Sequence, residues 1–355
     1  MKRRFSRTVS VGGLKLGGEY PVRIQSMTYT KTADKEATLA QIRALADAGC
    51  EIVRFSVPDE AAAASIPYLK EHSPLPLVAD IHFNYRLALL AAEYGIDKIR
   101  INPGNIGGEE RVKAVADACK ARGIPIRIGV NGGSLEKHIL AKYGGPTPEA
   151  LCESALYHVG LLEKFDFTDI VVSIKSSDVI TTIAANRLFA EQTDYPLHLG
   201  VTEAGTERMG LVKSSIGLGA LLADGIGDTM RVSLSDDVVK EVKAAKDILL
   251  ALGLRKGVRI VSCPTCSRTG IDVFSTAKRL EEALSDKPWD VTLAVMGCAV
   301  NGPGEAREAD IGIAGGNGEA LLFKKGEIVR KVEADKLFET LLAEAEALAA
   351  ERGQH

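Results

Sequence analysis

One pattern repeats from Val22 to Leu234: a short β-branched run, a polar cluster directly after it, and an amphipathic helix rich in alanine and leucine. This alternation predicts parallel strands with crossover helices. Eight strands are expected, at Val22–Met27, Ile52–Ser56, Leu77–Ile81, Lys98–Asn102, Pro125–Val130, Asp169–Ile174, Pro196–Val201 and Asp228–Ser233. Eight strand–helix units in about 250 residues are typical of a TIM barrel, so the sequence predicts this α/β fold.

Glycines follow several predicted helices and support the count of units. A glycine just past a helix adopts the left-handed backbone conformation that ends it. The pattern occurs at Thr38–Ala48 before Gly49, Leu87–Tyr94 before Gly95, Arg111–Arg122 before Gly123 and Val238–Leu252 before Gly253. A doubly wound open sheet is the structural alternative, but no G-x-G-x-x-G motif follows the first strand.

The rhythm changes after Gly253, where strands begin to outnumber helices. Strands are predicted at Val258–Ser262, Val291–Met296, Ala309–Ala314, Ala320–Lys324 and Glu327–Val332, with helices at Val273–Ser285 and Asp335–Arg352. This is the pattern of a small α+β domain and not of a ninth barrel unit. We therefore expect a TIM-barrel domain over residues 1–253 and a smaller α+β domain over residues 254–355.

Three cysteines of this second domain form a candidate metal site. Cys263 and Cys266 have C-x-x-C spacing, and Cys298 lies in a Gly/Pro-rich turn that ends at Glu305. A structural zinc site normally has two paired knuckles, and the second is missing here, although zinc stays as the alternative. A 4Fe-4S cluster held by three thiolates and the carboxylate of Glu305 has one iron with a harder, weaker ligand. Such a cluster is suited to contact with a substrate.

The predicted barrel strands end in many polar side chains, and five of these are cations: Arg54, Arg100, Arg127, Lys175 and Arg231. Active sites of TIM barrels are built at the carboxyl ends of the strands, where these cations could point into one mouth. Arginine is suited to bidentate binding of phosphate. Pairing with Asp80, Asp228 or Glu203 would still leave a positive surplus. The sequence therefore predicts a multiply phosphorylated ligand.

Other residues at the strand ends could complete such a site. The turn from Asn131 to Ser134 contains two glycines and offers backbone N–H groups to a phosphate. Asp80, His82, Asn102 and Thr202 are candidates for hydrogen bonds to the ligand, and a metal site at Asp80 and His82 is the weaker alternative. Glu203 directly follows the seventh predicted strand and is the candidate acid.

The composition narrows the choice of partners. The chain has 355 residues, 46% of them hydrophobic, and a net charge of −3, which gives no field for nucleic acids or anionic membranes. No apolar run is long enough for a membrane span or a signal peptide, so a cytoplasmic protein is expected. The scattered Cys50, Cys119 and Cys152 are interpreted as small buried hydrophobic residues and not as a disulfide framework.

The motifs around these sites resemble one known family over essentially the whole chain. They are Val261–Cys266, Met296–Ala306, Gln25–Thr28 and Ala79–Phe83. In these stretches the sequence is similar to the 4-hydroxy-3-methylbut-2-enyl diphosphate synthases of the non-mevalonate isoprenoid pathway, in their compact two-domain bacterial form. The resemblance implies a TIM barrel followed by an iron–sulfur domain.

The resemblance also implies a reaction and its partners. The family opens the ring of 2-C-methyl-D-erythritol 2,4-cyclodiphosphate reductively, with loss of water, to give 4-hydroxy-3-methylbut-2-enyl diphosphate. Two electrons come from reduced flavodoxin or ferredoxin. The family is a homodimer in which the cluster domain of one subunit caps the barrel of the other.

Site roles carried over from the resemblance fall on matching positions of this sequence. They imply that Cys263, Cys266, Cys298 and Glu305 bind the cluster, that Arg54, Arg100, Arg127 and Lys175 hold the diphosphate with help from Asn131 and Ser134, and that Glu203 assists proton transfer.

Two other functions are alternatives to this reaction. A phosphosugar aldolase or isomerase barrel with a structural zinc domain would use Lys175 to form a Schiff base. A non-catalytic iron or redox sensor would use the cysteines and leave the five strand-end cations unexplained.

Overall fold

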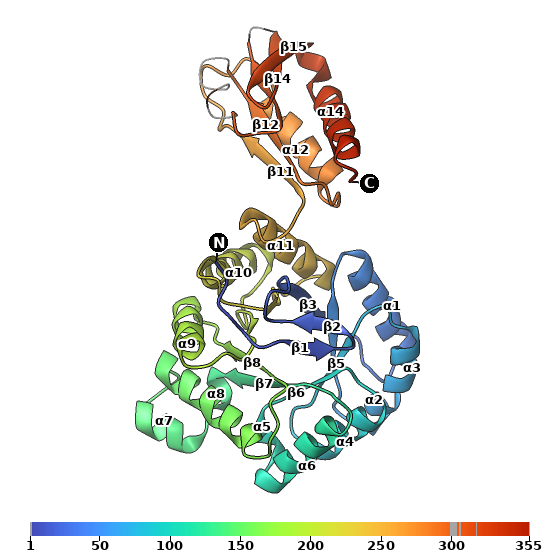
Figure 1. Ribbon diagram of the computed structural model, residues 1–355, viewed down its shortest axis with the longest axis vertical. Helices are drawn as coiled ribbons and strands as arrows, with labels where there is room; N and C mark the ends of the chain where they lie inside the picture. The colour runs from blue at the N-terminus through green and yellow to red at the C-terminus, as the bar shows by residue number, and fades with distance from the viewer. Residues whose placement is uncertain (1, 299–303, 305–306, 317, 355) are drawn as a thin grey trace. The chain divides into compact units, whose positions relative to one another are not determined.

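The computed structural model describes residues 2–298, 304, 307–316 and 318–354. The chain divides into two compact units, which meet between Leu252 and Gly253 (Figure 1).

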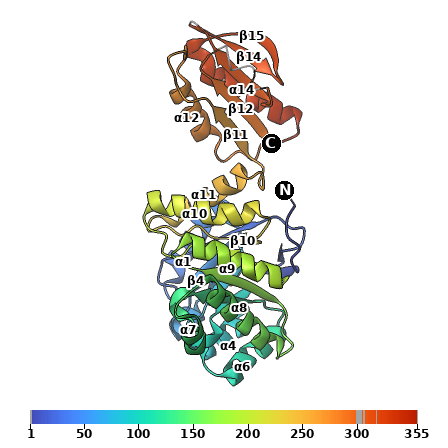
Figure 2. The same ribbon diagram turned by 90° about the vertical axis from the view of Figure 1, so that its left-hand side faces the viewer.

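The first unit is a parallel barrel with helices around its outside (Figures 1 and 2). Its strands are β3 (Arg23–Met27), β4 (Ile52–Ser56), β5 (Leu77–Asp80), β6 (Lys98–Ile101), β7 (Ile126–Asn131), β8 (Ile170–Lys175), β9 (His198–Leu199) and β10 (Thr229–Met230). The strands pair in the order β8-β7-β6-β5-β4-β3-β10-β9. A parallel bridge between Val172 and Leu197 joins β8 to β9 and closes the ring. The predicted TIM barrel is thus confirmed.

The last two barrel strands are much shorter than predicted at both ends, and Asp228 makes a side-chain contact where they start. Its Oδ2 accepts a hydrogen bond from Leu197 N at 2.8 Å, so a side chain takes the place of a backbone carbonyl at the start of β9. Its Oδ1 accepts from Ser6 Oγ at 2.8 Å and pairs with Arg3. Asp228 therefore ties the N-terminal segment to the barrel wall instead of serving the pocket.

The helices of the barrel are α1 (Lys35–Asp47), α2 (Glu60–Ala64), α3 (Ile66–His72), α4 (Tyr85–Glu93), α5 (Pro103–Ile106), α6 (Glu109–Lys120), α7 (Lys137–Tyr143), α8 (Pro148–Glu163), α9 (Val179–Gln192), α10 (Glu207–Ala223) and α11 (Val238–Ala251). Aspartates at N-caps begin several of them, as Asp178 does for α9 by accepting from Thr181 N. The glycines predicted to follow four helices have φ of 95° at Gly49, 78° at Gly95, 65° at Gly123 and 68° at Gly253. That prediction is confirmed.

A hairpin that the sequence analysis missed lies at the amino end of the barrel. It consists of β1 (Val9–Val11) and β2 (Leu14–Leu16), joined at Gly12 and Gly13. Val9, Val11 and Leu16 pack against Ile52, Val78 and Val171, which stand at or near the starts of barrel strands. Apolar residues alternating on either side of a Gly-Gly pair are the usual sign of a hairpin, so this signal was present in the sequence.

The second unit is a five-stranded sheet with helices on one face. The strands β11 (Val258–Ser262), β12 (Val291–Met296), β13 (Ile311–Gly315), β14 (Glu319–Lys324) and β15 (Glu327–Glu333) lie side by side in chain order (Figure 1). The first three are parallel and the last two antiparallel. Helices α12 (Val273–Leu284) and α14 (Leu337–Glu351) bury Leu280 and Leu341 against the sheet. The predicted small α+β domain is confirmed.

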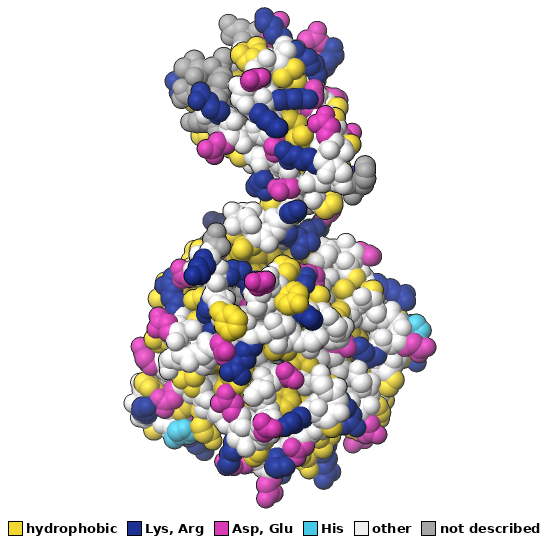
Figure 3. Space-filling view, in the orientation of Figure 1, with side chains coloured by type: hydrophobic (Ala, Val, Ile, Leu, Met, Phe, Trp, Pro, Cys, Tyr) yellow, Lys and Arg dark blue, Asp and Glu magenta, His cyan; other side chains and the backbone are white. Residues whose placement is uncertain are grey.

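The surface carries charges of both signs. In Figure 3, Lys and Arg side chains alternate with Asp and Glu over the visible faces of both units. None of the helices in the described ranges is both long enough and apolar enough to span a bilayer.

Candidate active site

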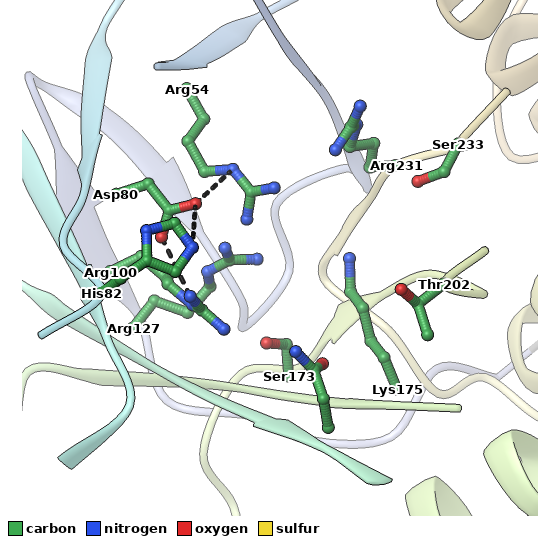
Figure 4. A pocket seen from close by; sticks show the side chains of 11 residues that line it. Arg54, Asp80, His82, Arg100, Arg127, Ser173, Lys175, Thr202, Arg231 and Ser233 are labelled. Atoms are coloured by element: carbon green, nitrogen blue, oxygen red, sulfur yellow. Dashed lines mark hydrogen bonds and ion pairs between the residues drawn. The ribbon is translucent and has the colours of Figure 1, made fainter. Parts of the chain in front are cut away.

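A polar pocket lies at the carboxyl ends of the barrel strands (Figure 4). It is lined by Arg54, Asp80, His82, Arg100, Arg127, Asn131, Ser173, Lys175, Thr202, Arg231 and Ser233. The five cations predicted from the strand ends all reach it, because parallel strands place their carboxyl ends at one rim. Five cations face one carboxylate among these lining residues. Ser173 and Ser233 also line the pocket and were not among the predicted site residues.

Asp80 organises two of the cations. Its Oδ1 accepts from Arg100 Nη1 at 3.0 Å, and its Oδ2 lies 3.7 Å from Arg54 Nε and 3.9 Å from His82 Nε2 (Figure 4). Burial alone would raise the pKa of Asp80, but Arg54, Arg100 and Arg127 lower it to about 2. Asp80 is therefore ionised at neutral pH and fixes the direction of both guanidinium groups.

Arg127 and Lys175 are the cations that stay uncompensated. Arg127 is 1% exposed, and no group in the described part of the chain accepts from its Nε or Nη1. Burial lowers the pKa of Lys175 well below its usual value, and the neighbouring Arg127, Arg54 and Arg231 lower it further. Buried donors without acceptors are costly unless a ligand satisfies them. Their arrangement suits an anion with several oxygens.

Arg231 is held from behind by a residue that the sequence analysis did not identify. Glu241, on α11, is buried and accepts from Arg231 Nε and Nη2, each at 3.1 Å. The same carboxylate accepts from Ser26 Oγ at 2.9 Å and Leu234 N at 3.0 Å. A glutamate on an amphipathic helix gives no sequence signal that distinguishes this role from an exposed one. Arg231 thus reaches the pocket already paired.

Met27 is a second missed contact. Its sulfur lies 2.8 Å from Arg54 Nη2 and 3.6 Å from Arg231 Nη1. A thioether is only a weak acceptor. The contact with Met27 therefore neutralises no charge on either guanidinium group.

Two glycines in the barrel wall make room for the cations. A Cβ atom on Gly129 would lie 2.4 Å from Arg100 Nε, and one on Gly200 would lie 2.7 Å from Lys175 Nζ. Glycine inside a strand commonly marks the close approach of another group. These positions therefore belong to the architecture of the pocket, although neither carries a functional group.

Three predicted site residues do not line the pocket: Asn102, Ser134 and Glu203. Asn102 Nδ2 donates to Ser134 Oγ at 2.9 Å, and Ser134 Oγ donates to the carbonyl of Asn131 at 3.2 Å. This chain of hydrogen bonds supports the turn that carries Asn131 into the pocket. The side chains of Asn102 and Ser134 are therefore paired with each other in this structure.

Glu203 lies beside the pocket on the loop after β9. Its neighbour Thr202 lines the pocket, whereas Glu203 itself is exposed. Its φ is 52°, in the left-handed region that non-glycine residues seldom adopt. Such backbone strain often marks functional loops and costs about 1–3 kcal/mol.

The cysteines of the second unit lie on neighbouring loops. Cys263 follows β11, and Cys298 comes two residues after β12, its parallel neighbour. The loops are joined by Gly270 N, which donates to the carbonyl of Gly297 at 2.8 Å, and by Gly297 N, which donates to Cys263 Sγ at 3.1 Å. N–H donors of this kind stabilise a thiolate.

The thiols carry part of the chemistry that a cluster requires. Hydrogen bonds from Arg268 lower the pKa of Cys266, which favours its thiolate, and the charge of Cys298 also acts on Arg268. Within the described ranges, no three His, Cys, Asp or Glu side chains converge closely enough to hold a metal ion. Glu305, the predicted fourth ligand, lies outside the described residues. The donor set fits an iron–sulfur cluster by its soft thiolates and its N–H donors to sulfur.

The fold and the site together define the class of this protein. It is a barrel enzyme for a phosphorylated substrate, and the same chain carries a second domain with thiols. The GcpE TIM-barrel domain matches residues 6–246, and the GcpE protein C-terminal domain matches residues 259–347. The chain therefore belongs to the GcpE family.

Relatives that cover nearly the whole chain share one name, 4-hydroxy-3-methylbut-2-en-1-yl diphosphate synthase (flavodoxin). The protein of Maridesulfovibrio salexigens is 59% identical over 95% of this chain and 94% of its own. The protein of Clostridium perfringens is 57% identical over 96% of this chain and 98% of its own. The family resemblance drawn from the motifs is thereby confirmed, and the aldolase alternative is not favoured.

Two solved structures of other proteins resemble this chain over part of its length. The sialic acid synthetase of Leptospira borgpetersenii has a TM-score of 0.51 at 16% identity, over 71% of this chain and 92% of its own. The dihydropteroate synthase of Yersinia pestis has a TM-score of 0.51 at 12% identity, over 69% of this chain and 98% of its own. At such identities the likeness shows a shared fold.

Proposed function

We propose that this chain catalyses the reductive ring opening of 2-C-methyl-D-erythritol 2,4-cyclodiphosphate to 4-hydroxy-3-methylbut-2-enyl diphosphate, with loss of water. The family supplies the reaction. The observation in this structure that supports it most is the unpaired, buried guanidinium of Arg127 beside Lys175 in a pocket with a surplus of cations. A cyclic diphosphate offers phosphate oxygens to both groups.

We propose a role in this reaction for each predicted residue of the pocket. Arg54, Arg100, Arg127 and Lys175 hold the diphosphate, with Arg231 and Asn131 at its edges. Asp80 keeps Arg54 and Arg100 in position, and His82 and Thr202 hydrogen-bond the hydroxyl groups of the carbon skeleton. Asn102 and Ser134 support the turn of Asn131.

Glu203 is the proposed proton donor for the departing hydroxyl group. Its loop continues directly from Thr202 in the pocket wall. A carboxyl at the rim can exchange protons with solvent before the site closes and deliver one afterwards.

The thiolates of Cys263, Cys266 and Cys298, with Glu305, would hold a 4Fe-4S cluster. When bound, such a cluster supplies two electrons in succession and an iron that can accept an oxygen ligand. Reduced flavodoxin or ferredoxin is the proposed electron donor, and flavodoxin appears in the names of the relatives. Thiols that must stay reduced favour a reducing compartment, so we also propose a cytoplasmic location.

The proposed assembly is a homodimer in which each cluster domain serves the barrel of the other subunit. The proposal rests on the family resemblance and on the separation of the two sites into two compact units.

The test is conversion of the cyclodiphosphate by the full-length chain after anaerobic reconstitution with iron and sulfide. Dithionite or reduced flavodoxin supplies electrons, and the linear product is detected by mass spectrometry. Arg127→Met should lose roughly 10- to 100-fold in affinity for the substrate, because charge-assisted hydrogen bonds are removed. If the fully loaded wild-type protein leaves the cyclodiphosphate unchanged, the assignment is wrong.

A further inference from the structure

A layer of buried polar side chains lies inside the barrel. Gln25, Lys98, His198 and Thr229 are each at most 1% exposed. TIM barrels usually fill this space with branched aliphatic side chains. Below the layer, at the amino end, are the apolar residues packed by the hairpin, and above it is the cationic pocket. A polar layer in this place needs an explanation beyond packing.

Lys98 crosses the interior of the barrel. Its Nζ donates to Gln25 Oε1 at 3.5 Å. The two residues stand on β6 and β3, which are separated in the sheet by β4 and β5. This long hydrogen bond is the one polar contact found for Lys98 Nζ among the described residues. No carboxylate in those residues lies within ion-pair distance of it.

The charged neighbours of Lys98 are all cations or potential cations. In addition to burial, the positive charges of Arg127 on β7 and Arg54 on β4 lower the pKa of Lys98. The charge of Lys98 in turn adds to the effect of burial in lowering the pKa of His198 on β9. His198 Nδ1 is 2.7 Å from Thr229 Oγ1, and its Nε2 has no partner in the described structure. Burial holds the pKa of Lys98 well below its usual value, and Arg127 and Arg54 lower it further. The buried position of Lys98 and the two nearby guanidinium groups therefore favour its uncharged amine in the ligand-free protein.

The reaction changes the charge that the barrel must hold. A cyclic diphosphate has one acidic hydroxyl on each phosphorus, whereas a linear diphosphate ester has three in total. Cleavage of the ring C–O bond with two electrons leaves both electrons of that bond on the phosphate oxygen. The bound diphosphate therefore gains one negative charge, in addition to the charge brought by binding.

We propose that Lys98 is a charge-compensating residue, which takes up a proton from solvent when a diphosphate binds above it on Arg127. This inference rests on the proposed function of the pocket. An anion on Arg127 offsets the positive charge that acts on Lys98, and charges interact strongly in the low dielectric of the interior. Lys98 does not touch the substrate. Lys98 affects the site by changing the net charge below the bound diphosphate.

Proton uptake on binding can be measured directly. Inorganic pyrophosphate is titrated calorimetrically into the reconstituted full-length chain at one pH, in buffers of different ionisation enthalpy. The dependence of the heat on the buffer gives the number of protons taken up. Lys98→Met should take up about one proton fewer than the wild type.

Gln25→Glu provides a second route to the same quantity. A carboxylate beside Lys98 keeps the lysine protonated before the ligand arrives, so this variant should also take up about one proton fewer. It changes no side-chain size, which protects the test if Lys98→Met fails to fold.

The outcomes separate the inference from the proposed function. Tight binding of pyrophosphate with equal proton uptake in the wild type and both variants overturns the role of Lys98 and leaves the pocket assignment intact. Absence of pyrophosphate binding by the wild-type protein overturns the anion pocket, and the inference falls with it.

Discussion

Asp80 shows how one residue can set the electrostatics of a site. Placed among Arg54, Arg100 and Arg127, its carboxylate compensates part of their charge and leaves the rest for a ligand. Asp80 orients Arg54 and Arg100, whereas Nε and Nη1 of the buried Arg127 have no acceptor among the described residues. The pocket therefore combines hydrogen-bond donors of fixed orientation with positive charge that Asp80 does not compensate.

Asp80→Asn should reduce stability in a manner that depends on pH. The folded-state pKa of Asp80 is about 2, below its ordinary 3.8. Its carboxylate thus stabilises the fold above about pH 4, and this contribution disappears as the pH falls toward 2. At neutral pH the loss should be roughly 2 kcal/mol.

Chemical denaturation followed by circular dichroism measures this difference, while fluorescence of the single tryptophan, Trp289, monitors the second unit. The control is Asp224→Asn, which removes the exposed ion pair with Arg187 and should change stability very little. A loss that persists unchanged at pH 2 would contradict the assigned cause.

Glu305 tests whether an exchangeable iron ligand matters. Glu305→Cys should bind about four irons per chain, because a fourth thiolate closes the cluster, yet its turnover should fall at least roughly 10-fold. Iron and sulfide analysis is compared with the rate of product formation on the same sample. Full iron content with undiminished turnover would contradict the need for the carboxylate.

The barrel strands shape the site in two ways. Some strand positions carry the cations, and others are glycines whose missing side chains leave space for those cations. Gly129 in β7 and Gly200 just after β9 provide the space into which Arg100 and Lys175 extend. The position of a cation is thus decided jointly by its own strand and by a neighbouring one.

Gly200→Ala should weaken anion binding about 10-fold, since the new methyl group would lie 2.7 Å from Lys175 Nζ and 3.1 Å from the carbonyl of Arg231. Pyrophosphate calorimetry measures the affinity. Gly219→Ala on α10 is the matched control, because nothing lies within 4 Å of its added Cβ. The control should retain its affinity and gain about 0.5–1 kcal/mol of stability. Equal affinities in the two variants would count against the role given to Gly200.

Elements were predictable where a local pattern determines them. The β-branched runs identified β4, β11 and β12 with their observed ends, because each segment contains at least two Val or Ile residues. The ring of cations followed from the rule that parallel strands bring their carboxyl ends together. The starts of the short β9 and β10 were not predictable, since the Asp228 side chain accepts from Leu197 N, a residue distant in the sequence.

The sequence predicted which types of residue line the site, but it did not predict which residues pair with one another. Nothing local in the sequence shows that Glu241 pairs with Arg231 or that Lys98 reaches Gln25, because both contacts depend on the closed ring. Glu203 was expected to face the pocket, and its exposed position leaves its catalytic role as a proposal.

For the whole molecule, the central fact is that anion site and thiol site stand on two separate compact units. The proposed homodimer makes a direct prediction about mixed subunits. Arg127→Met damages only the barrel, and Cys298→Ser damages only the cluster domain.

Co-refolding equal amounts of these two variants should restore about a quarter of the wild-type sites, because half of the dimers are mixed and each contains one intact pair of domains. Product formation by the mixture is compared with that of each variant alone. Activity no greater than the sum of the two separate samples would show that each subunit uses its own cluster.

The hairpin of β1 and β2 covers the end of the barrel that lies away from the pocket. Its apolar side chains pack against Ile52, Val78 and Val171 near the starts of the strands. An apolar layer disfavours the passage of a charge. The proton that we propose for Lys98 is therefore expected to enter from the side of the pocket, together with the anion.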